Sequence, residues 1–345
     1  MAKDVIGWGV IGCGTIGPWH AKAVNRLPET RLVAACDVIP ERAQQLAQEY
    51  GAARWYADYE KLLADPEVDA VSICTPSGLH SDLAVAAAQA GKHALSEKPM
   101  DITLAKADAM IAAHRAAGTR LAVIFQRRTS PLWQYLQRVV SEGRLGHMVL
   151  GDAYLKYYRS QEYYDSAEWR GTWALDGGGA LMNQGVHCID LLRWVMGPVD
   201  TIFAFAAPLV RKIEVEDTAV AALRFANGAF GVLQGTTSVT PGLDHRLEFH
   251  GELGSIRVDG GKLVGWQVPG VEAPATQEEG GSAAADPADI GTDGHTIQMR
   301  DLVAAIREDR PPMVSGEDAR AAVEVILGVY QSARTGQPVR LPLPS

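Results

Sequence analysis

Two short segments carry side chains that could move a proton to or from a hydroxyl group. Residues 96–100, "SEKPM", place Lys98 directly before a proline, and residues 176–194, "DGGGALMNQGVHCIDLLRW", contain His187. An ammonium group can donate a hydrogen bond to a substrate oxygen and favour its alkoxide form. A histidine, with a reference pKa near ~6.5, can accept the hydroxyl proton as hydride leaves the carbon. The two segments therefore predict the oxidation of an alcohol.

Both residues also have a structural interpretation. Most lysines lie at the surface, so Lys98 could belong to a surface turn. His187 could be a core histidine that is hydrogen-bonded to Asp190 on the next turn. In a helix that begins near Gly179, three polar residues fall at spacings of four and three, namely Asn183, His187 and Asp190. They form one polar stripe, which should face a cleft or a hydrogen-bonded network because its burial elsewhere costs desolvation energy.

A glycine-rich turn near the start of the chain could hold the cofactor that such an oxidation needs. The segment "IGCGTIGPWH" follows an apolar stretch, and it has three glycines at the spacing of a dinucleotide-binding turn, Gly12, Gly14 and Gly17. Amide groups at the helix start would meet the pyrophosphate charge. Asp37 lies twenty residues after the third glycine, the position of a carboxylate that binds the adenosine ribose. The alternative is a close-packed turn with an incidental surface aspartate.

Asp37 also bears on the choice between the two nicotinamide cofactors. Its carboxylate would repel a ribose 2′-phosphate, so the sequence favours NAD over NADP. A nearby arginine, Arg42 or Arg54, could soften that preference.

The elements that must position these residues alternate between strand and helix over the first ~125 residues, which predicts a parallel sheet covered by helices on both faces. Strands are expected at residues 5–12, 31–37, 69–75, 92–100 and 120–126. Helices are expected at residues 16–27, 40–51, 76–91 and 101–118. Such a doubly wound sheet binds ligands at the carboxyl ends of its strands.

The segment "CTPSGLH" lies at one of these carboxyl ends. Three of its residues could line the cofactor, Thr75, Pro76 and Ser77. Ser77 could also cap the next helix while Pro76 sets the turn, and both interpretations can hold at one sheet edge.

After Gln126 the aromatic and glycine content rises, which indicates a second, sheet-rich domain. Residues 217–237 and 244–261 alternate apolar and polar side chains, as strands of a mostly antiparallel sheet do. Residues 268–294 are typical of a long surface loop, and residues 318–336 of an amphipathic helix with a glycine stop. We therefore expect three parts: an NAD-binding domain over 1–125, a substrate and oligomerisation domain over 126–312, and a C-terminal helix and tail over 313–345.

The composition of the 345-residue chain, with 47% hydrophobic and 21% charged residues, is that of an ordinary globular protein. Two domains are expected because a single hydrophobic core stops growing near ~250 to 300 residues. The formal net charge of -9 offers no basic excess for nucleic acid. No apolar run approaches the ~20 residues that span a bilayer, so no membrane partner is expected.

The start of the chain predicts a cytoplasmic location, because residues 1–4 run directly into an apolar stretch and leave no room for a secretory signal. The cysteines are too widely spaced to suggest a zinc site or a disulfide framework. They are expected to be buried thiols, Cys13, Cys36, Cys74 and Cys188. No metal is expected.

Taken together, these motifs resemble the Gfo/Idh/MocA family of sugar and cyclitol oxidoreductases. "GVIGCGTIG", Asp37, "CTPSGLH", "SEKPM" and "GGGALMNQGVHCIDL" occur in that family's order and spacing, and the resemblance covers nearly the whole chain. It implies a Rossmann domain and an α+β domain with a large, mostly antiparallel open sheet, whose outer face forms a dimer or tetramer interface. It also implies a final helix that packs back on the first domain.

The resemblance implies roles for individual residues. Lys98 matches the lysine of the family's Glu-Lys-Pro motif, and His187 matches its catalytic histidine. Members such as inositol dehydrogenase have an aspartate four residues before that histidine, where this chain has Asn183. An amide cannot share a proton, so Lys98 and His187 must carry the transfer without an aspartate relay. Asn183 resembles the subgroup of UDP-N-acetyl-glucosaminuronate dehydrogenases, which keeps a sugar-nucleotide substrate open.

The motifs and the resemblance together predict two sets of contacts. The cofactor set is Gly12, Gly14, Thr15, Ile16, Gly17, Asp37, Thr75, Pro76, Ser77, His80, Glu97, Lys98 and Gln126. The substrate set is Arg127, Tyr158, Arg159, Tyr164, Trp169, Arg170, Asn183 and His187. Aromatic faces suit the C–H faces of sugar rings, and arginines suit carboxylates or phosphates. Each aromatic residue and arginine could instead be structural or interfacial.

The sequence thus predicts an NAD-dependent enzyme that oxidises a secondary hydroxyl of a sugar, cyclitol or sugar derivative to a ketone. Lys98 would polarise the oxygen, His187 would take the proton, and Asn183 would orient a neighbouring hydroxyl. One alternative is a redox-neutral lyase, glycosidase or epimerase that uses tightly bound NAD transiently. Another is a non-catalytic, cofactor-dependent regulator. Trp19 and His20 receive only a structural role.

Overall fold

The computed structural model describes residues 5–275 and 293–344 of a chain that divides into two compact units. The first unit contains residues 1–126 and 292–320, and the second contains residues 127–291 and 321–345. The division after Gln126 falls where the sequence pattern changes. Residues 292–312, which were expected in the second domain, group with the first unit instead. Most of the expected loop at 268–294 lies outside the described residues.

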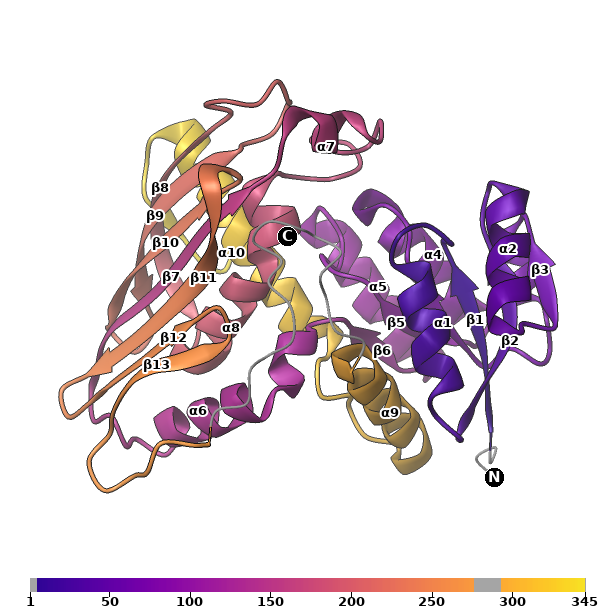
Figure 1. Cartoon of the computed structure of the whole chain (residues 1–345), viewed down its shortest axis with the longest axis horizontal. Helices are drawn as coiled ribbons and strands as arrows, with labels where there is room; N and C mark the ends of the chain where they lie inside the picture. Colours follow the sequence, from indigo (N-terminus) through magenta and orange to yellow (C-terminus); the bar gives the residue numbers. More distant parts are fainter. Residues whose placement is uncertain (1–4, 276–292, 345) are drawn as a thin grey trace. The chain divides into compact units, whose positions relative to one another are not determined.

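The first unit is built on a six-stranded sheet in the order β3-β2-β1-β4-β5-β6 (Figure 1). Its strands are β1 (Ile6–Ile11), β2 (Thr30–Cys36), β3 (Arg54–Tyr56), β4 (Ala70–Ile73), β5 (His93–Ser96) and β6 (Leu121–Val123). Every neighbouring pair is parallel. This order confirms the doubly wound Rossmann sheet, in which the strand order reverses between β1 and β4.

The helices of this unit pack in two groups. One group is α1 (Gly17–Asn25), α2 (Pro40–Tyr50) and α9 (Asp293–Glu308), and the other is α3 (Tyr59–Leu63), α4 (His80–Gln89) and α5 (Leu104–Ala117). Helix α9 belongs to the hydrophobic core of the first unit although it comes after β13 of the second unit in sequence. Its buried Met299 and Leu302 cluster with Trp8 and Val10 of β1.

Local sequence explains most of these boundaries. All six residues of β1 are buried, as expected for a strand covered on both faces. Pro40 occupies the first turn of α2, and Gly51 ends it in the left-handed conformation with φ 76°. The Thr103 side chain accepts a hydrogen bond from the Lys106 amide and caps α5. Strand β3 and helix α3 were not predicted, because three and five residues are too few to show a period.

The second unit is built on an eight-stranded sheet in the order β13-β12-β11-β7-β10-β9-β8-β14. Its strands are β7 (Met148–Tyr158), β8 (Val199–Ala207), β9 (Thr218–Phe225), β10 (Phe230–Thr236), β11 (Ser238–Gly251), β12 (Ser255–Asp259), β13 (Lys262–Gln267) and β14 (Val339–Arg340). The pairing of β7 with β10 is parallel, and the other pairs are antiparallel. The expected mostly antiparallel sheet is confirmed.

Helices of the second unit lie against one face of this sheet (Figure 1). They include α6 (Pro131–Ser141) and α8 (Val186–Met196), which pack on each other, and α8 also packs on β7 and β11. A short helix, α7 (Gln161–Asp165), follows β7, and α10 (Gly316–Thr335) leads to the last strand. Within the described ranges, no helix combines the length and the hydropathy needed to cross a bilayer.

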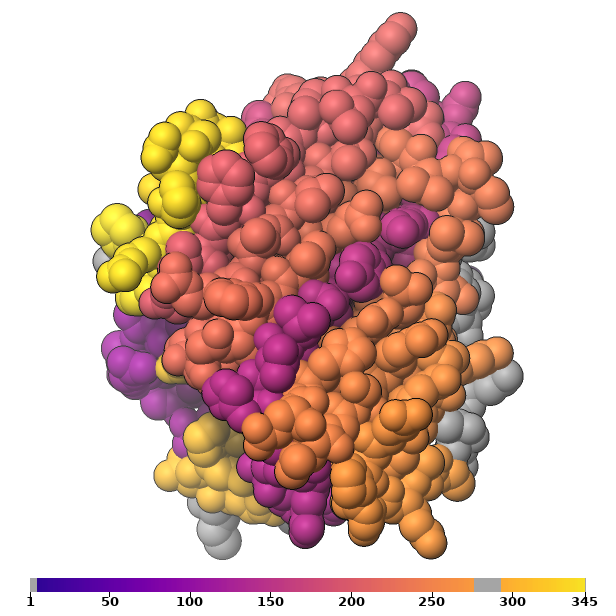
Figure 2. Space-filling view, turned by 90° about the vertical axis from the view of Figure 1, so that its left-hand side faces the viewer, coloured from indigo at the N-terminus to yellow at the C-terminus, as the bar shows by residue number. Residues whose placement is uncertain are grey.

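The opposite face of the eight-stranded sheet presents apolar side chains to solvent. Phe205 pairs with Val220, and Phe230 pairs with both Arg224 and Leu150, so these side chains share one face. Phe205 is 71% exposed and Phe230 is 60% exposed. Figure 2 views this face, with β7 crossing it as a magenta band between the strands drawn in salmon and those drawn in orange. The exposed apolar residues of this face, Leu150, Phe203, Phe205, Val220, Phe230 and Val232, are called the sheet patch below.

Candidate active site

The three glycines of the first turn meet different requirements. Gly12 has φ 94°, and a Cβ there would lie 2.5 Å from the Cys74 carbonyl oxygen. A Cβ at Gly17 would lie 2.4 Å from the carbonyl oxygen of Gly12, so α1 can begin this close to the strand only with glycine. A Cβ at Gly14 would meet no atom of the described chain within 4 Å. Packing therefore requires Gly12 and Gly17, whereas Gly14 leaves an open surface that suits a pyrophosphate.

Asp37 faces this turn from the end of β2. Its Oδ2 accepts a hydrogen bond from the Cys13 amide at 2.8 Å, and its Oδ1 accepts one from the Ile39 amide at 2.9 Å. The Asp37 side chain is almost fully buried. Because a carboxylate has about four acceptor sites, the two amides leave capacity for ribose hydroxyls. Asp37 thus has a structural role and the geometry for the expected cofactor role.

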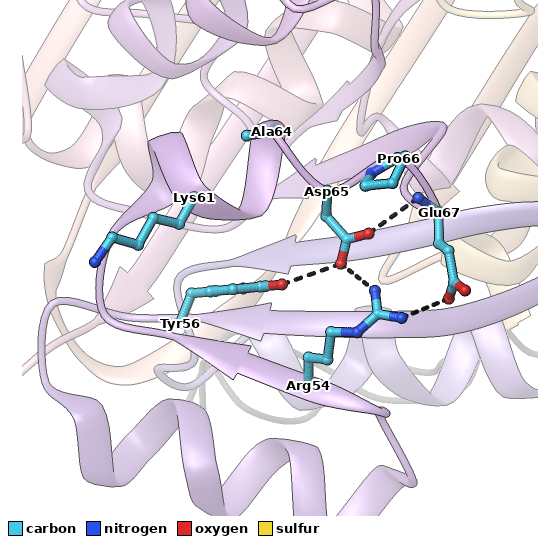
Figure 3. Close-up of a pocket in the computed structure, with 7 residues that line it drawn as sticks. All are labelled: Arg54, Tyr56, Lys61, Ala64, Asp65, Pro66 and Glu67. Carbon is cyan, nitrogen blue, oxygen red and sulfur yellow. Dashed lines mark hydrogen bonds and ion pairs between the residues drawn. The ribbon is translucent and has the colours of Figure 1, made fainter.

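Arg54 does not fit the role considered for it above, that of softening the preference for NAD over NADP. Its guanidinium forms ion pairs with Asp65 at 2.5 Å and with Glu67 at 2.8 Å (Figure 3). These residues line a surface pocket of about 520 Å³ beside β3 and α3. Since both ion pairs hold the guanidinium there, Arg42 is left as the arginine that could soften the preference for NAD.

The segment after β4 differs from the expected helix start. Thr75 and Pro76 are half-buried, and Ser77 lies in a 3-10 turn, Ser77–Leu79, that precedes α4. Leu79 holds the cap position of α4 without a side-chain hydrogen bond, so the alternative in which Ser77 caps this helix is wrong. His80 is buried, and its ring nitrogens lie 2.8 Å from the Pro99 carbonyl oxygen and 2.9 Å from that of Thr75. Its ring therefore joins the strand ends of β4 and β5.

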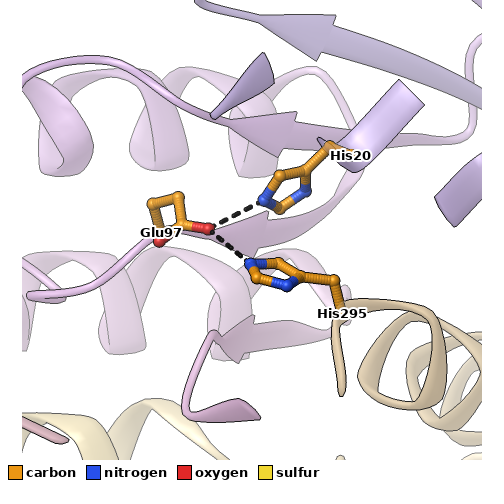
Figure 4. A group of neighbouring side chains, drawn as sticks. All are labelled: His20, Glu97 and His295. Atoms are coloured by element: carbon orange, nitrogen blue, oxygen red, sulfur yellow. Dashed lines mark hydrogen bonds and ion pairs between the residues drawn. The ribbon is translucent and has the colours of Figure 1, made fainter. Parts of the chain in front are cut away.

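Glu97 and Lys98 follow β5 at the same edge of the sheet. Lys98 is half-buried, whereas Glu97 is buried. Oε1 of Glu97 accepts hydrogen bonds from His20 Nε2 at 2.9 Å and from His295 Nε2 at 3.2 Å (Figure 4). Burial alone would raise the pKa of the Glu97 carboxyl, but hydrogen bonds from the two histidines hold it well below its usual range. The Glu97 carboxylate is therefore ionised and engaged inside the unit.

The remaining cofactor candidates lie at the ends of β1 and β6. Thr15 is exposed and Ile16 is half-buried at the start of α1. Gln126 is half-buried, and a Cβ at Gly294 would lie 2.7 Å from its Cβ. The first unit thus gathers its candidates at the carboxyl ends of β1, β2, β4, β5 and β6, the edge that binds ligands in doubly wound sheets.

In the second unit, the helix that carries His187 is interrupted. Residues Ala180–Gly185 form a π-helical turn, and α8 begins only at Val186. Asn183 and His187 are half-buried, but Asp190 is almost fully buried and accepts two hydrogen bonds from Arg128, at 2.8 and 2.6 Å. Asp190 therefore lies in a hydrogen-bonded network, one of the two settings expected for the polar stripe, through its buried ion pair with Arg128.

Glu216 binds the backbone at the start of the π-helical turn. Glu216 accepts hydrogen bonds from the amides of Gly179 at 2.9 Å and Leu181 at 2.8 Å, and from the Tyr330 hydroxyl at 2.9 Å. Its burial raises the pKa of the carboxyl to about 7. The glycines before the turn are explained by this packing, because a Cβ at Gly179 would lie 1.9 Å from the Glu216 carbonyl oxygen.

A hydrogen-bonded network joins several expected substrate residues. The Asn183 amide donates to Asp176 at 2.9 Å, and its oxygen accepts from Gln184 at 3.2 Å. Gln184 also donates to the Tyr163 hydroxyl at 3.1 Å and accepts from Arg159 at 3.1 Å. Arg170 donates to the same hydroxyl at 2.6 Å and stacks on Trp169, 4.7 Å from the ring centre. Gln184, Tyr163 and Asp176 were not predicted, although each lies within a segment singled out for its neighbours.

The side chains of three other expected substrate residues have polar or charged partners outside this network. Arg127 donates to the buried His245. Burial and the charge of Arg127 lower the pKa of His245 well below its usual range, so its neutral ring can accept that bond. Tyr158 lies under the guanidinium of Arg211, 5.2 Å from the ring centre. The buried Tyr164 hydroxyl shares a hydrogen bond with Thr237 at 2.8 Å. Tyr164 is thus better explained as a core residue.

Comparison with known families identifies both units. Residues 6–125 match the model of an oxidoreductase family with an NAD-binding Rossmann fold, and residues 133–257 match the GFO/IDH/MocA C-terminal domain. This chain belongs to the Gfo/Idh/MocA oxidoreductase family. Its first unit is accordingly an NAD-binding Rossmann domain.

Relatives within the Gfo/Idh/MocA family extend over the whole chain. A myo-inositol 2-dehydrogenase of Thermotoga maritima is 30% identical, covering 96% of this chain and 98% of its own. A scyllo-inositol 2-dehydrogenase (NAD(+)) of Bacillus subtilis is 28% identical, covering 96% and 95%. The WlbA dehydrogenase from Bordetella pertussis, crystallised with NADH and UDP-GlcNAcA, is 35% identical with a TM-score of 0.89, covering 99% and 100%.

Proposed function

We propose that this Gfo/Idh/MocA member oxidises a secondary hydroxyl group of a sugar, cyclitol or sugar derivative to a ketone, with NAD as its cofactor. The observation that carries the proposal is the carboxyl edge of the parallel sheet, where an open glycine turn, the Asp37 carboxylate and Lys98 lie together. The named dehydrogenases among its relatives support the same reaction class.

The residues at this edge fit NAD. Gly14 leaves room for the pyrophosphate beside amides at the start of α1, and Asp37 retains acceptor capacity for the ribose. Bound NAD supplies the acceptor for the hydride that leaves the substrate carbon. Lys98 would donate a hydrogen bond to the reacting oxygen and stabilise its developing negative charge. The His187 imidazole would take the hydroxyl proton, so that the hydride and this proton together account for the two hydrogens removed from the alcohol.

Asn183 would orient a neighbouring hydroxyl of the substrate. Its amide donates to Asp176 and accepts from Gln184, so the side chain has a fixed orientation. Arg159 and Arg170 belong to the same network and would suit a carboxylate or phosphate. For this reason we place a sugar-nucleotide acid such as UDP-GlcNAcA, which WlbA holds in its crystal structure, first among the substrates to test.

The experiment is a spectrophotometric screen of NADH formation with UDP-GlcNAcA, myo-inositol and scyllo-inositol, each with NAD and with NADP. The proposal expects NADH to accumulate in proportion to ketone product with at least one compound, and NADP to react more slowly. Product formation without NADH accumulation would instead establish the redox-neutral alternative. A protein that binds NADH but turns over none of a wider panel of sugars and uronic acids would favour the regulator.

We further infer that the chain assembles into a homodimer or homotetramer through the sheet patch. The exposure of Phe205 and Phe230 on one continuous face supports this, because large exposed apolar patches mark interaction sites.

We also propose a cytoplasmic location, which the four buried free thiols fit.

A further inference from the structure

We propose that His20 and His295 are positioning residues for Lys98, which they act on through the buried carboxylate of Glu97. This inference rests on the proposed role of Lys98. His20 comes from α1 and His295 from α9, and both ring Nε2 atoms lie at hydrogen-bond distance from the same Glu97 oxygen (Figure 4). The other Glu97 oxygen accepts a hydrogen bond from the Lys98 amide at 3.2 Å.

A directed chain of hydrogen bonds orients the His20 ring. The Trp8 indole donates to Ser72 Oγ at 2.9 Å, and Ser72 Oγ lies 2.8 Å from His20 Nδ1. An indole N–H can only donate, so the Ser72 hydroxyl proton is left to point at Nδ1. His20 then carries its proton on Nε2 and donates it to Glu97. Burial lowers the pKa of His20, which agrees with this neutral tautomer.

His295 completes the support from a distant part of the sequence. Its ring meets that of His20 edge-on, with centroids 5.3 Å apart and planes at 75°. Both rings and Glu97 are buried, and burial strengthens hydrogen bonds to a charged group. On the other side of Lys98, the Pro99 carbonyl oxygen lies 2.8 Å from the buried His80 ring. The backbone is therefore held on both sides of the lysine.

The arrangement connects the cofactor turn to the proposed catalytic lysine. Helix α1 begins at Gly17, three residues before His20, so its first turn both follows the glycine turn and holds Glu97. A displacement of about 1 Å at a reacting group can lower turnover by about a hundredfold. Holding Glu97 and Pro99 limits how far the Lys98 backbone can move, and this is the function we assign to the two histidines.

Two histidines and a carboxylate could also bind a metal ion, since their ligand atoms lie within 4.8 Å of one another. A metal would need the lone pair of each Nε2. An ionised Glu97 can only accept, so each Nε2 must donate to it, and His20 would have to exchange its bond with Ser72 to become a ligand. The hydrogen-bonded arrangement therefore favours positioning over metal binding.

The test compares four variants of the full chain, His20→Ala, His295→Ala, His20→Gln and His114→Ala, with UDP-GlcNAcA or the best substrate of the screen. His114 is the matched control, because it is also buried in this unit but bonds to Thr119 and not to Glu97. We expect both Glu97-linked alanine variants to lose about tenfold in kcat while the Kd for NADH changes less than about twofold. His20→Gln, whose amide can donate to Glu97, should recover most of the loss.

The outcomes separate this inference from the proposed function. Lys98→Ala is measured in parallel, and wild-type turnover in that variant would refute the role of Lys98 itself. If Lys98→Ala is inactive but His20→Ala and His295→Ala keep the kcat of the folded His114→Ala control, the positioning role is overturned. Stoichiometric zinc in the purified wild-type enzyme that disappears in His20→Ala would also overturn it, in favour of a metal site.

Discussion

Lys98 and His187 have different roles in the proposed reaction: Lys98 donates a hydrogen bond to the reacting oxygen, and His187 takes the hydroxyl proton. Lys98→Ala and His187→Ala are expected to fold and to bind NADH, because neither variant removes a core side chain. Both should lower kcat by about a hundredfold or more, the usual contribution of a charge-stabilising donor for Lys98 and of a proton-transfer group for His187. The measurement is steady-state kinetics together with an NADH titration.

The exposed residues Lys61 and His147 provide matched controls for these two variants. Replacing either by alanine should leave kcat unchanged. Full activity in Lys98→Ala or His187→Ala would remove that residue from the mechanism.

Asp37 combines a structural and a cofactor role at one side chain. Asp37→Asn keeps an acceptor for one amide but loses the charge, so KM for NAD should rise about tenfold, as expected when a charge-assisted hydrogen bond is lost. The ratio of kcat/KM for NADP over NAD should rise at the same time, because the repulsion of the 2′-phosphate disappears. The control is Asp82→Asn, at an exposed position in the first turn of α4. An unchanged cofactor ratio would contradict the ribose assignment.

At the scale of elements, the helix that carries His187 depends on a buried acid. Glu216 binds the amides at the start of the π-helical turn, and burial raises its pKa from 4.5 to about 7. The folded state therefore holds the proton more tightly than the unfolded chain. This contribution to stability is fully present below about pH 4.5 and is lost as the pH rises through about 7, by up to about 3 kcal/mol.

Glu216→Gln should flatten that pH dependence, because the amide stays neutral. Urea unfolding of the variant and of wild type near pH 5 and near pH 8, about the two ends of the window, measures the difference. Glu168→Gln, at an exposed position, should show the wild-type slope. Equal slopes for Glu216→Gln and wild type would show that Glu216 does not titrate in this range.

The secondary structure elements themselves were largely predictable. Pro40 and Gly51 mark the ends of α2, and the alternation of β9 gives one buried and one exposed face. The π-helical turn before α8 was not predictable, because its start is determined by the distant Glu216 rather than by local spacing. The spacing from Asn183 to His187 and Asp190 therefore runs from this turn into α8 instead of along one regular helix.

At the scale of the whole molecule, the sheet patch predicts self-association. Phe205→Glu should shift the protein toward the monomer in light scattering coupled to gel filtration, because a charge cannot be buried there without a partner. Leu209→Glu is the control, since Leu209 is 69% exposed but lies after β8 rather than in the sheet. An unchanged mass for Phe205→Glu would place any interface elsewhere on the chain.

Local sequence by itself determined the longer Rossmann strands and helices of residues 5–126, the glycine turn with Asp37, and the two segments that contain Lys98 and His187. These features depend on backbone preferences and on periods of two or 3.6 residues, which neighbouring residues encode. Only the tertiary structure decided which partners the polar residues have. His20 and His295 bind Glu97 although they lie 77 and 198 residues from it in the sequence. Arg128 binds Asp190, which lies 62 residues further along the chain. No local period links positions so far apart, because their contact follows from the packing of α1, α8 and α9 in the folded units.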